Sequence, residues 1–459
     1  ENKGHASLTG VPESEKVVFL RRFCQNGGST KNQKPERKTD VNHSATAFKA
    51  REQLKNFLGE LSPQFSKPLG KFVGDMVYGI QASQDVKLSR IARALDEPIS
   101  MKKLEDRLSR MLGSEGIEQG ISGAVARLGS RHVHQDTLIV IDPTDIRKLY
   151  AKKMEHLARV RDGSTGETGN GYSACLAVAC ESGGRRITPL HMRLWSSGAE
   201  GFTSQNGEVL GVIDQISSRA KKRGIYVIDR GGDGDWLFDG LDRRKLDYIV
   251  RLVGNRNLLH GRRAAPAEEL AASCPMKHIE IVTRETGDGV KSYKLEFGAM
   301  TVALPQRPDK PLRMVVVKGF GERPVLLLTT LAGTTSRKSL WQVVEGCLTR
   351  WRVEDAIRFV KQSYNLEDIR VLTYRRLKNM VALLLAVIYF NCVWLAGRLR
   401  CEILTTNITH AAKRIYGVAE FLHYAVADGL GRLSTRHGKW NGYKPPDPES
   451  NPLGLVFLE

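Results

Sequence analysis

Three acidic residues lie at points of the sequence where a folded chain would hold them rigidly. Asp142 ends the apolar run Leu138–Ile141, and Asp229 ends the similar run Ile225–Ile228. Short apolar runs of this kind predict buried strands. Glu354 lies in a segment whose apolar residues recur at helical spacing. Carboxylates on rigid elements can bind hard divalent cations, and such cations catalyse phosphoryl transfer.

Basic residues surround the third acid. Four charged residues share one predicted helix face, because they are spaced by 4, 4 and 3 positions: Arg350, Glu354, Arg358 and Lys361. In a helix of no special function this pattern predicts an exposed face, with ion pairs from Glu354 to Arg350 and to Arg358. The alternative is a site in which bases flank an acid, and it needs further acids nearby. The two strand-ending aspartates are the candidates.

Three segments of the chain resemble the acidic motifs of DDE-type transposases of bacterial insertion sequences: Ile139–Ile146, Tyr226–Gly231 and Arg350–Lys361. The resemblance is to the branch that carries a β-rich insertion between the second Asp and the Glu. In that branch the last motif reads Tyr, Arg, Glu and Lys at offsets 0, 3, 7 and 14. The Arg, Glu and Lys offsets are matched here, whereas Cys347 replaces the Tyr.

The resemblance implies the chemistry of the site. Two Mg²⁺ or Mn²⁺ ions would be bound by the three acids Asp142, Asp229 and Glu354. One ion would activate water or a 3′-hydroxyl, and the other would stabilise the leaving oxygen. Three bases would contact phosphate oxygens: Arg230, Arg350 and Lys361. For Arg230, the alternative role is to orient the second Asp. Double-stranded DNA, as transposon ends and target, is the implied partner, and a homodimer on DNA is the implied assembly.

The spacing of the acids along the chain predicts an inserted subdomain. Asp142 and Asp229 are 87 residues apart, and Glu354 follows after another 125. Short β-rich stretches between polar loops occupy residues 248–330, where we expect the insertion. The predicted fold class is therefore α/β, with a catalytic domain at 132–400 and a C-terminal helical region and tail at 401–459. The resemblance implies that its core is ribonuclease H-like.

Residues 45–131 show helical periodicity and few strand-like runs, which predicts a separate α-helical domain before the core. Within it, residues 88–112 read as helix, turn and helix, with Ser100 as the cap of the second helix. That second helix would present Lys102, Lys103 and Arg107 to DNA. Two ordinary packed helices give the same pattern, so DNA contact and simple packing both remain open.

The charge of the chain favours a polyanionic partner. Its 459 residues include 70 Lys and Arg against 50 Asp and Glu, a formal net charge of +20. Nucleic acid is the leading partner on this ground, although a basic enzyme without such a partner has the same composition. Residues 1–44 read as a basic flexible arm.

The cysteines and the apolar segments bear on the location of the protein. Seven scattered cysteines with no Cys-x-x-Cys pair favour reduced thiols, and hence a cytoplasmic, nucleoid-associated protein. Met380–Gly397 is uncharged for 18 residues. We expect a buried core helix there, with a membrane span as the lesser alternative, and no membrane partner.

Other acids and histidines have simpler explanations. Asp145 follows Pro143 and reads as a helix cap, and the acids after Asp229 read as a loop and helix start. His132 and His134 have no matched third ligand for zinc. Phosphate-binding loops and zinc-protease motifs are absent from the sequence.

These observations predict a transposase that binds the terminal inverted repeats of an insertion sequence and catalyses metal-dependent strand cleavage and strand transfer. One alternative is a catalytically inactive or domesticated DNA-binding descendant, which Cys347 keeps open. Another is a ribonuclease H-like nuclease without strand transfer.

Overall fold

The structure is a computed structural model that describes residues 41–163, 165–184, 186–286, 289–331, 333, 336–396, 401–412 and 422–446. Nearly all of the predicted basic arm (1–44) lies outside the described residues, as do 447–459 of the predicted tail and Gly397. The described chain divides into two compact units. We call 37–250 together with 349–459 the core unit, and 251–348 the insertion unit.

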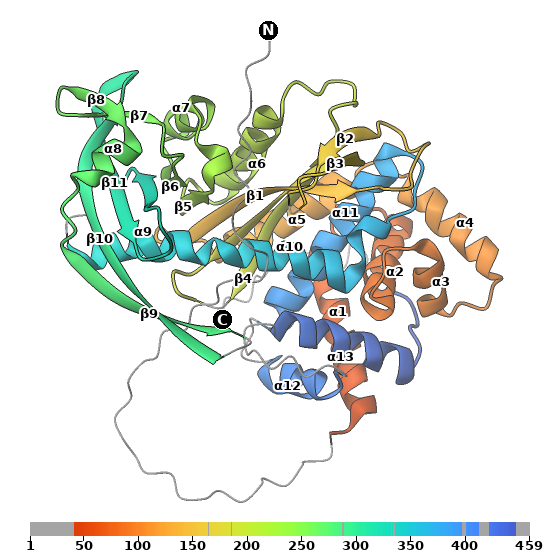
Figure 1. The fold of residues 1–459 in the computed structure, drawn as a ribbon. Helices are drawn as coiled ribbons and strands as arrows, with labels where there is room; N and C mark the ends of the chain where they lie inside the picture. Colours follow the sequence, from red (N-terminus) through yellow and green to blue (C-terminus); the bar gives the residue numbers. More distant parts are fainter. Residues whose placement is uncertain are drawn as a thin grey trace, which may run out of the picture. The chain divides into compact units, whose positions relative to one another are not determined.

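Five helices open the described chain (Figure 1): α1 (His43–Leu61), α2 (Lys67–Ser83), α3 (Leu88–Leu95), α4 (Met101–Leu112) and α5 (Ile117–Ser130). The Asn42 side chain caps α1 by accepting a hydrogen bond from the amide of Ala45. Helices α3 and α4 have the predicted bounds, but Ser100 makes no side-chain capping bond. These helices belong to the same compact unit as the sheet described next.

The core unit contains a mixed sheet in the order β2-β3-β1-β5-β6, with β4 beside β3. Its strands are β1 (Leu138–Arg147), β2 (Ala158–Arg161), β3 (Thr168–Cys180), β4 (Ile187–Trp195), β5 (Ile225–Ile228) and β6 (Asp247–Arg251). Strand β1 runs antiparallel to β3 and parallel to β5. Residues Leu138–Ile141 are almost completely buried, as in a strand covered on both faces. The predicted mixed α/β class is confirmed.

Two expectations about this sheet are wrong. The apolar run Leu138–Ile141 predicts a strand that ends by Asp142 and Pro143, but β1 continues to Arg147 through pairing with β3. Pairing with β5 stops at Val140, so the proline lies where one side of β1 has no pairing partner and its missing amide is tolerated. The stretch from Tyr248, which we assigned to the insertion, instead forms β6 and pairs in parallel with β5.

Further helices complete the core unit: α6 (Gln205–Arg219), the 3₁₀ turn η1 (Arg230–Gly232), α7 (Asp235–Arg244), α10 (Trp351–Tyr364), the 3₁₀ turn η2 (Leu366–Asp368), α11 (Tyr374–Tyr389), the π-helix η3 (Phe390–Leu395), α12 (Glu402–His410) and α13 (Leu422–Arg436). Helices α5, α6 and α11 pack against β4, whereas α10 packs against β1 and β3. Helix α9 (Arg337–Thr349) ends directly before Arg350, and α10 begins directly after it.

The apolar segment that begins at Tyr374 is a core helix. In the described residues it is the one helix long and apolar enough to cross a membrane, and 94% of its apolar window is buried inside the protein. Its burial agrees with the expected core helix.

The insertion unit is rich in strands. Its elements are β7 (Asn257–His260), β8 (Arg263–Pro266), α8 (Ala267–Ala272), β9 (His278–Thr286), β10 (Gly289–Leu304), β11 (Arg307–Lys318), β12 (Val325–Thr329) and α9 up to Leu348. The strands lie in the order β12-β11-β10-β7-β8, with β9 beside β10. Gly298 on β10 is required by close packing, because a Cβ there would lie 1.9 Å from the carbonyl oxygen of Pro275.

A buried polar network joins three helices of the core unit. Tyr364 at the end of α10 donates its hydroxyl proton to Oε1 of Gln81 on α2, at 3.0 Å. Asn391 in η3 donates from Nδ2 to the same Oε1, at 2.9 Å, and to the Tyr364 hydroxyl, at 2.5 Å. All three side chains are buried. The network therefore fixes the end of α10 against elements far away in the sequence.

We expect Tyr364→Phe to lower the free energy of unfolding by about 1–3 kcal/mol, because it leaves one N–H of the buried Asn391 amide without its acceptor and Oε1 of Gln81 with one donor fewer. The measurement is urea denaturation followed by circular dichroism. Tyr150→Phe is the matched control, since Tyr150 is 94% exposed, and it should change the value by less than about 0.5 kcal/mol. Equal effects of the two variants would contradict a stabilising network.

Candidate active site

The two predicted aspartates lie side by side at the ends of adjacent parallel strands. In the register of β1 and β5, Val140 is paired with Val227. Asp142 and Asp229 each follow two residues later, so parallel pairing brings them to the same level of the sheet. Carboxyl ends of parallel strands are where α/β proteins commonly bind ligands. The sheet register therefore brings the first two acids together.

The third acid reaches this edge from α10. Glu354 is in the first turn of α10, which packs on β1, and its side chain is partly exposed. Arg350, the residue before the helix, is 4% exposed and lies between the acids. One of its guanidinium nitrogens is 3.0 Å from Oε1 of Glu354, and another is 3.8 Å from Oδ2 of Asp229. The ion pair between Arg350 and Glu354 expected from their spacing is confirmed.

The pKa of Asp142 is influenced by both of the other acids. Burial raises the pKa of Asp142 to about 7. Arg350 opposes this rise, whereas the negative charges of Glu354 and Asp229 add to it. A carboxyl that is hard to ionise beside two other carboxylates marks an excess of negative charge at this edge.

This donor set suits a hard divalent cation by its chemistry. Three carboxylates supply the oxygen ligands that Mg²⁺ and Mn²⁺ prefer, and a cation would offset both the burial and the neighbouring negative charges that raise the pKa of Asp142. In the described residues, no three carboxylate, imidazole or thiol groups converge closely enough to hold a metal ion. Arg350 supplies the compensating positive charge in this conformation.

Lys361 lies at the same edge of the sheet. Its Nζ is 3.8 Å from Oδ2 of Asp145 and 3.1 Å from Oε1 of Glu367. Asp145 is part of β1, so its expected role as a helix cap is wrong, because the strand does not end at the proline. The contact instead links α10 to the second half of β1.

Comparison with known proteins decides the family. The family model described as "Transposase DDE domain" matches residues 134–390, more than half of the chain. The chain belongs to this transposase family. No curated protein matches it. Among solved structures, it is similar to the piggyBac transposase synaptic complex with hairpin DNA, with 10% sequence identity, 88% of each chain covered and a TM-score of 0.38.

The matched range includes the three candidate acids and the candidate bases beside them. A transposase is the DNA-cleaving enzyme that the three motifs predicted, and the family assignment confirms the recognition at that level. Transposases of this DDE type generally use divalent metal ions. The roles of the individual residues stay predictions.

Arg230 and the bases of α4 lie in other surroundings. Arg230, in the turn η1 directly after Asp229, is exposed. On α4, Lys102 and Lys103 are exposed, whereas Arg107 forms an ion pair with Glu97. This pairing lowers the pKa of Glu97. Of the three predicted DNA-contacting residues on α4, the two lysines are thus the more accessible.

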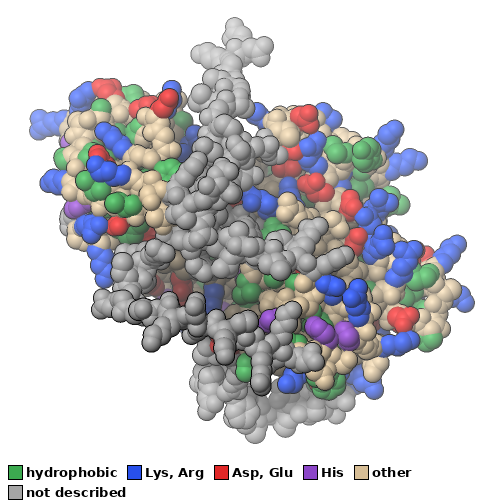
Figure 2. Space-filling model, turned by 60° about the horizontal axis from the view of Figure 1, so that its bottom comes forward, with side chains coloured by type: hydrophobic (Ala, Val, Ile, Leu, Met, Phe, Trp, Pro, Cys, Tyr) green, Lys and Arg blue, Asp and Glu red, His purple; other side chains and the backbone are tan. Residues whose placement is uncertain are grey.

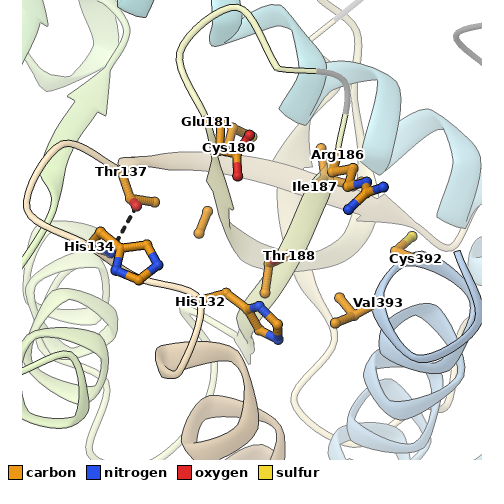
Figure 3. Close-up of a pocket in the computed structure, with 11 residues that line it drawn as sticks. His132, His134, Thr137, Cys180, Glu181, Arg186, Ile187, Thr188, Cys392 and Val393 are labelled. Carbon is orange, nitrogen blue, oxygen red and sulfur yellow. Dashed lines mark hydrogen bonds between the residues drawn. The ribbon is translucent and has the colours of Figure 1, made fainter. Parts of the chain in front are cut away.

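Two histidines considered as metal ligands line a small cavity of about 110 Å³. His132 and His134 follow α5 and face this cavity with Cys180 and Glu181 (Figure 3). They lie in the connection between α5 and β1. Among the described residues, they belong to no group of three ligands that could hold a metal ion.

Sequence reasoning missed Lys148, which directly follows β1. Its side chain is 5% exposed, and its Nζ donates to the carbonyl oxygens of Glu367, at 2.5 Å, and Ile369, at 3.1 Å. Burial lowers its pKa to about 8. Lys148 thus ties the end of β1 to the segment after α10. A lysine at the end of a predicted strand gives no signal of this role, because its acceptors are backbone atoms.

We expect Asp142→Asn to stabilise the metal-free protein at alkaline pH. An unfolded aspartate has a pKa near 3.9, so between about pH 4 and 7 the folded protein keeps a proton that the unfolded chain loses. The contribution of Asp142 to stability therefore falls as pH rises through this window. Relative to its effect at pH 4, the substitution should add about 1–3 kcal/mol to the free energy of unfolding at pH 8.

The measurement is urea denaturation in excess chelator at both pH values. Asp136→Asn is the matched control, because Asp136 is exposed in the loop before β1. A stabilisation that is the same at pH 4 and pH 8 would contradict a buried, unfavourable charge at Asp142.

Proposed function

We propose that this protein binds the terminal inverted repeats of a bacterial insertion sequence and catalyses metal-dependent DNA cleavage and strand transfer. The observation that carries the proposal is the meeting of Asp142, Asp229 and Glu354 at one edge of the core sheet, within a chain of the DDE transposase family. In this proposal the core is ribonuclease H-like, and the protein works in the cytoplasm, associated with the nucleoid.

The three carboxylates would hold two Mg²⁺ or Mn²⁺ ions. Such ions activate the attacking oxygen and stabilise the leaving oxygen of a phosphodiester. The part of this chain is to hold the acids on β1, β5 and α10, and to neutralise phosphate charge with basic side chains. The ion pairs of Arg350 with Asp229 and Glu354 support such a role for Arg350, and the contact of Lys361 with Asp145, three residues after Asp142, supports it for Lys361. Arg230 lies next to Asp229 and is exposed to an approaching phosphate.

Double-stranded DNA is the proposed partner, with a homodimer as the assembly that acts on it. The net charge of +20 supports a polyanionic partner. Figure 2 shows Lys and Arg side chains spread over much of the described surface in view, interspersed with fewer acids. The piggyBac structure to which the chain is similar is a synaptic complex of that transposase with hairpin DNA.

A catalytically inactive DNA-binding descendant is the second candidate. Cys347 on α9 replaces the tyrosine of the resembling branch, and Arg350 engages two of the acids in the present conformation. A nuclease that cleaves without joining is the third. These three functions differ in the products they give from the same DNA substrate, so one assay separates them.

We expect Glu354→Gln to abolish cleavage and strand transfer, with a loss of roughly 100-fold or more, because it removes a metal-binding oxygen charge without changing side-chain size. The assay uses labelled DNA with the flanking inverted repeats, Mn²⁺ and the full chain. Glu402→Gln is the matched control, since Glu402 is exposed on α12, and it should retain activity.

The wild-type products decide among the candidates. Cleaved and joined products support the transposase, and cleaved products alone support the nuclease. Specific binding without either product, in wild type and variant alike, supports the inactive descendant and contradicts the proposal.

We expect Lys103→Gln to weaken DNA binding more than Arg107→Gln does. Lys103 is exposed, so the loss of a phosphate contact should reduce the slope of log affinity against log salt by about one. Arg107 is held by Glu97, and its loss should change the slope much less. Fluorescence anisotropy across a salt series measures both. Unchanged slopes for both variants would show that α4 packs without contacting DNA.

A further inference from the structure

A cavity of about 400 Å³ in the core unit is lined by none of the three proposed catalytic acids. Its walls come from β4, α5, α6 and the start of α11. The segment after β4, which includes Gly201 and Phe202, closes one side. The family assignment and the proposed chemistry give this cavity no role.

Two buried polar groups in the cavity have no hydrogen-bond partner among the described residues. His191 on β4 is 8% exposed and its Nδ1 has no partner. Ser122 on α5 is 7% exposed and its Oγ has none either. A buried polar group without a hydrogen-bond partner destabilises the fold. Two such groups in one cavity indicate a ligand that meets both.

The backbone around His191 is irregular. The pairing of β3 with β4 goes from Ala177–His191 to Val178–Pro189, so Leu190 is an extra residue on β4. Bulges of this kind change the direction of side chains and are common at functional sites. The bulge lies directly beside His191.

Most charges in the cavity already have partners within it. Nε of Arg193 is 2.5 Å from Oε2 of Glu208, and Nζ of Lys378 is 3.3 Å from Oε2 of Glu118. Within each of these two ion pairs, the positive and negative charges cancel. Arg219, in the last turn of α6, bonds only neutral oxygens of Gln215 in the described structure. Glu200 is exposed, so Arg219 is the less solvated of the two remaining charges.

The potential near His191 is positive. Burial and the charges of Arg193 and Arg219 lower the pKa of His191 to about 4. The ring is therefore neutral at physiological pH, and one of its nitrogens can donate a hydrogen bond. An anion is the ligand that a positive potential and neutral donors favour together.

The cavity continues into a second one, which suggests an extended ligand. The neighbouring hollow, of about 450 Å³, shares Gln119, Gly123 and Arg219 with the first. Gly123 leaves open space beside Arg219, because a Cβ at this position would lie 3.7 Å from the guanidinium Nη2, an ordinary van der Waals distance. Arg219 thus stands at the junction of the two hollows, with room for a group larger than a single ion.

We propose that this cavity binds a phosphate group of a nucleotide or a DNA strand, with Arg219 supplying the charge and Ser122 and His191 donating hydrogen bonds. A phosphate oxyanion has enough acceptor oxygens to serve all three donors. Two sources offer this chemistry, a free nucleotide and the backbone of bound DNA. Binding of a free nucleotide does not depend on the proposed function, whereas the backbone alternative rests on it.

The first experiment uses isothermal titration calorimetry of the full chain with inorganic phosphate and with thymidine 5′-monophosphate. We expect Arg219→Gln and Ser122→Ala each to weaken binding, the former by tenfold or more. Lys221→Gln is the matched control, because it removes the same charge from an exposed residue just after α6, and its affinity should stay within twofold. Thermal melting of each variant separates loss of binding from loss of fold.

The second experiment measures duplex binding across a salt series with the same variants. If the backbone is the source, free phosphate does not bind, and Arg219→Gln reduces the salt slope by about one while Lys221→Gln does not. If Arg219→Gln, folded by its melting curve, changes neither nucleotide nor duplex binding, the proposal is overturned. Cleavage activity of the wild type is read separately, so failure of the proposed catalysis leaves this test intact.

Discussion

The burial of a carboxyl beside two others is the constraint on which the arrangement of the core unit depends. The register of β1 with β5 brings Asp142 level with Asp229, and α10 adds Glu354 to the same edge. Burial raises the pKa of Asp142, and the charges of Glu354 and Asp229 add to this rise, so an ionised Asp142 opposes folding unless a positive charge compensates it. Arg350 supplies that compensation from the position between α9 and α10, where its guanidinium contacts both Asp229 and Glu354.

Placing α10 requires support from far along the chain. One end carries Arg350 and Glu354, while the other ends at Tyr364, in hydrogen-bond contact with Gln81 and Asn391. Lys148 fixes the segment that follows α10 to the end of β1. A site that concentrates like charges is thus held by buried hydrogen bonds that do not involve its carboxylates. Such support agrees with the general need of functional sites for rigid surroundings.

The sequence predicted the elements that carry strong local signals, and missed those that depend on pairing. Helices α3 and α4 and the strands ending at Asp142 and Asp229 follow from apolar periodicity and turn residues. The continuation of β1 past Pro143 does not, because it depends on one-sided pairing with β3 that no local pattern encodes. The three acids were found because the family motifs consist of particular residue types at particular spacings along the chain. Lys148 and the cavity around His191 were not, because backbone acceptors and unpartnered atoms appear only in three dimensions.

Arg350 links the structural and the chemical arguments. In the metal-free chain it is the counter-ion of two acids, and in the proposed reaction a divalent cation would take over that role. The guanidinium would then be released from the carboxylates while still confined to the same edge of the sheet. A positive, nearly buried side chain beside a metal site is suited to a phosphate oxygen, the group that the proposed substrate brings. Under the proposed function, the same residue would stabilise the fold before DNA arrives and bind the substrate afterwards.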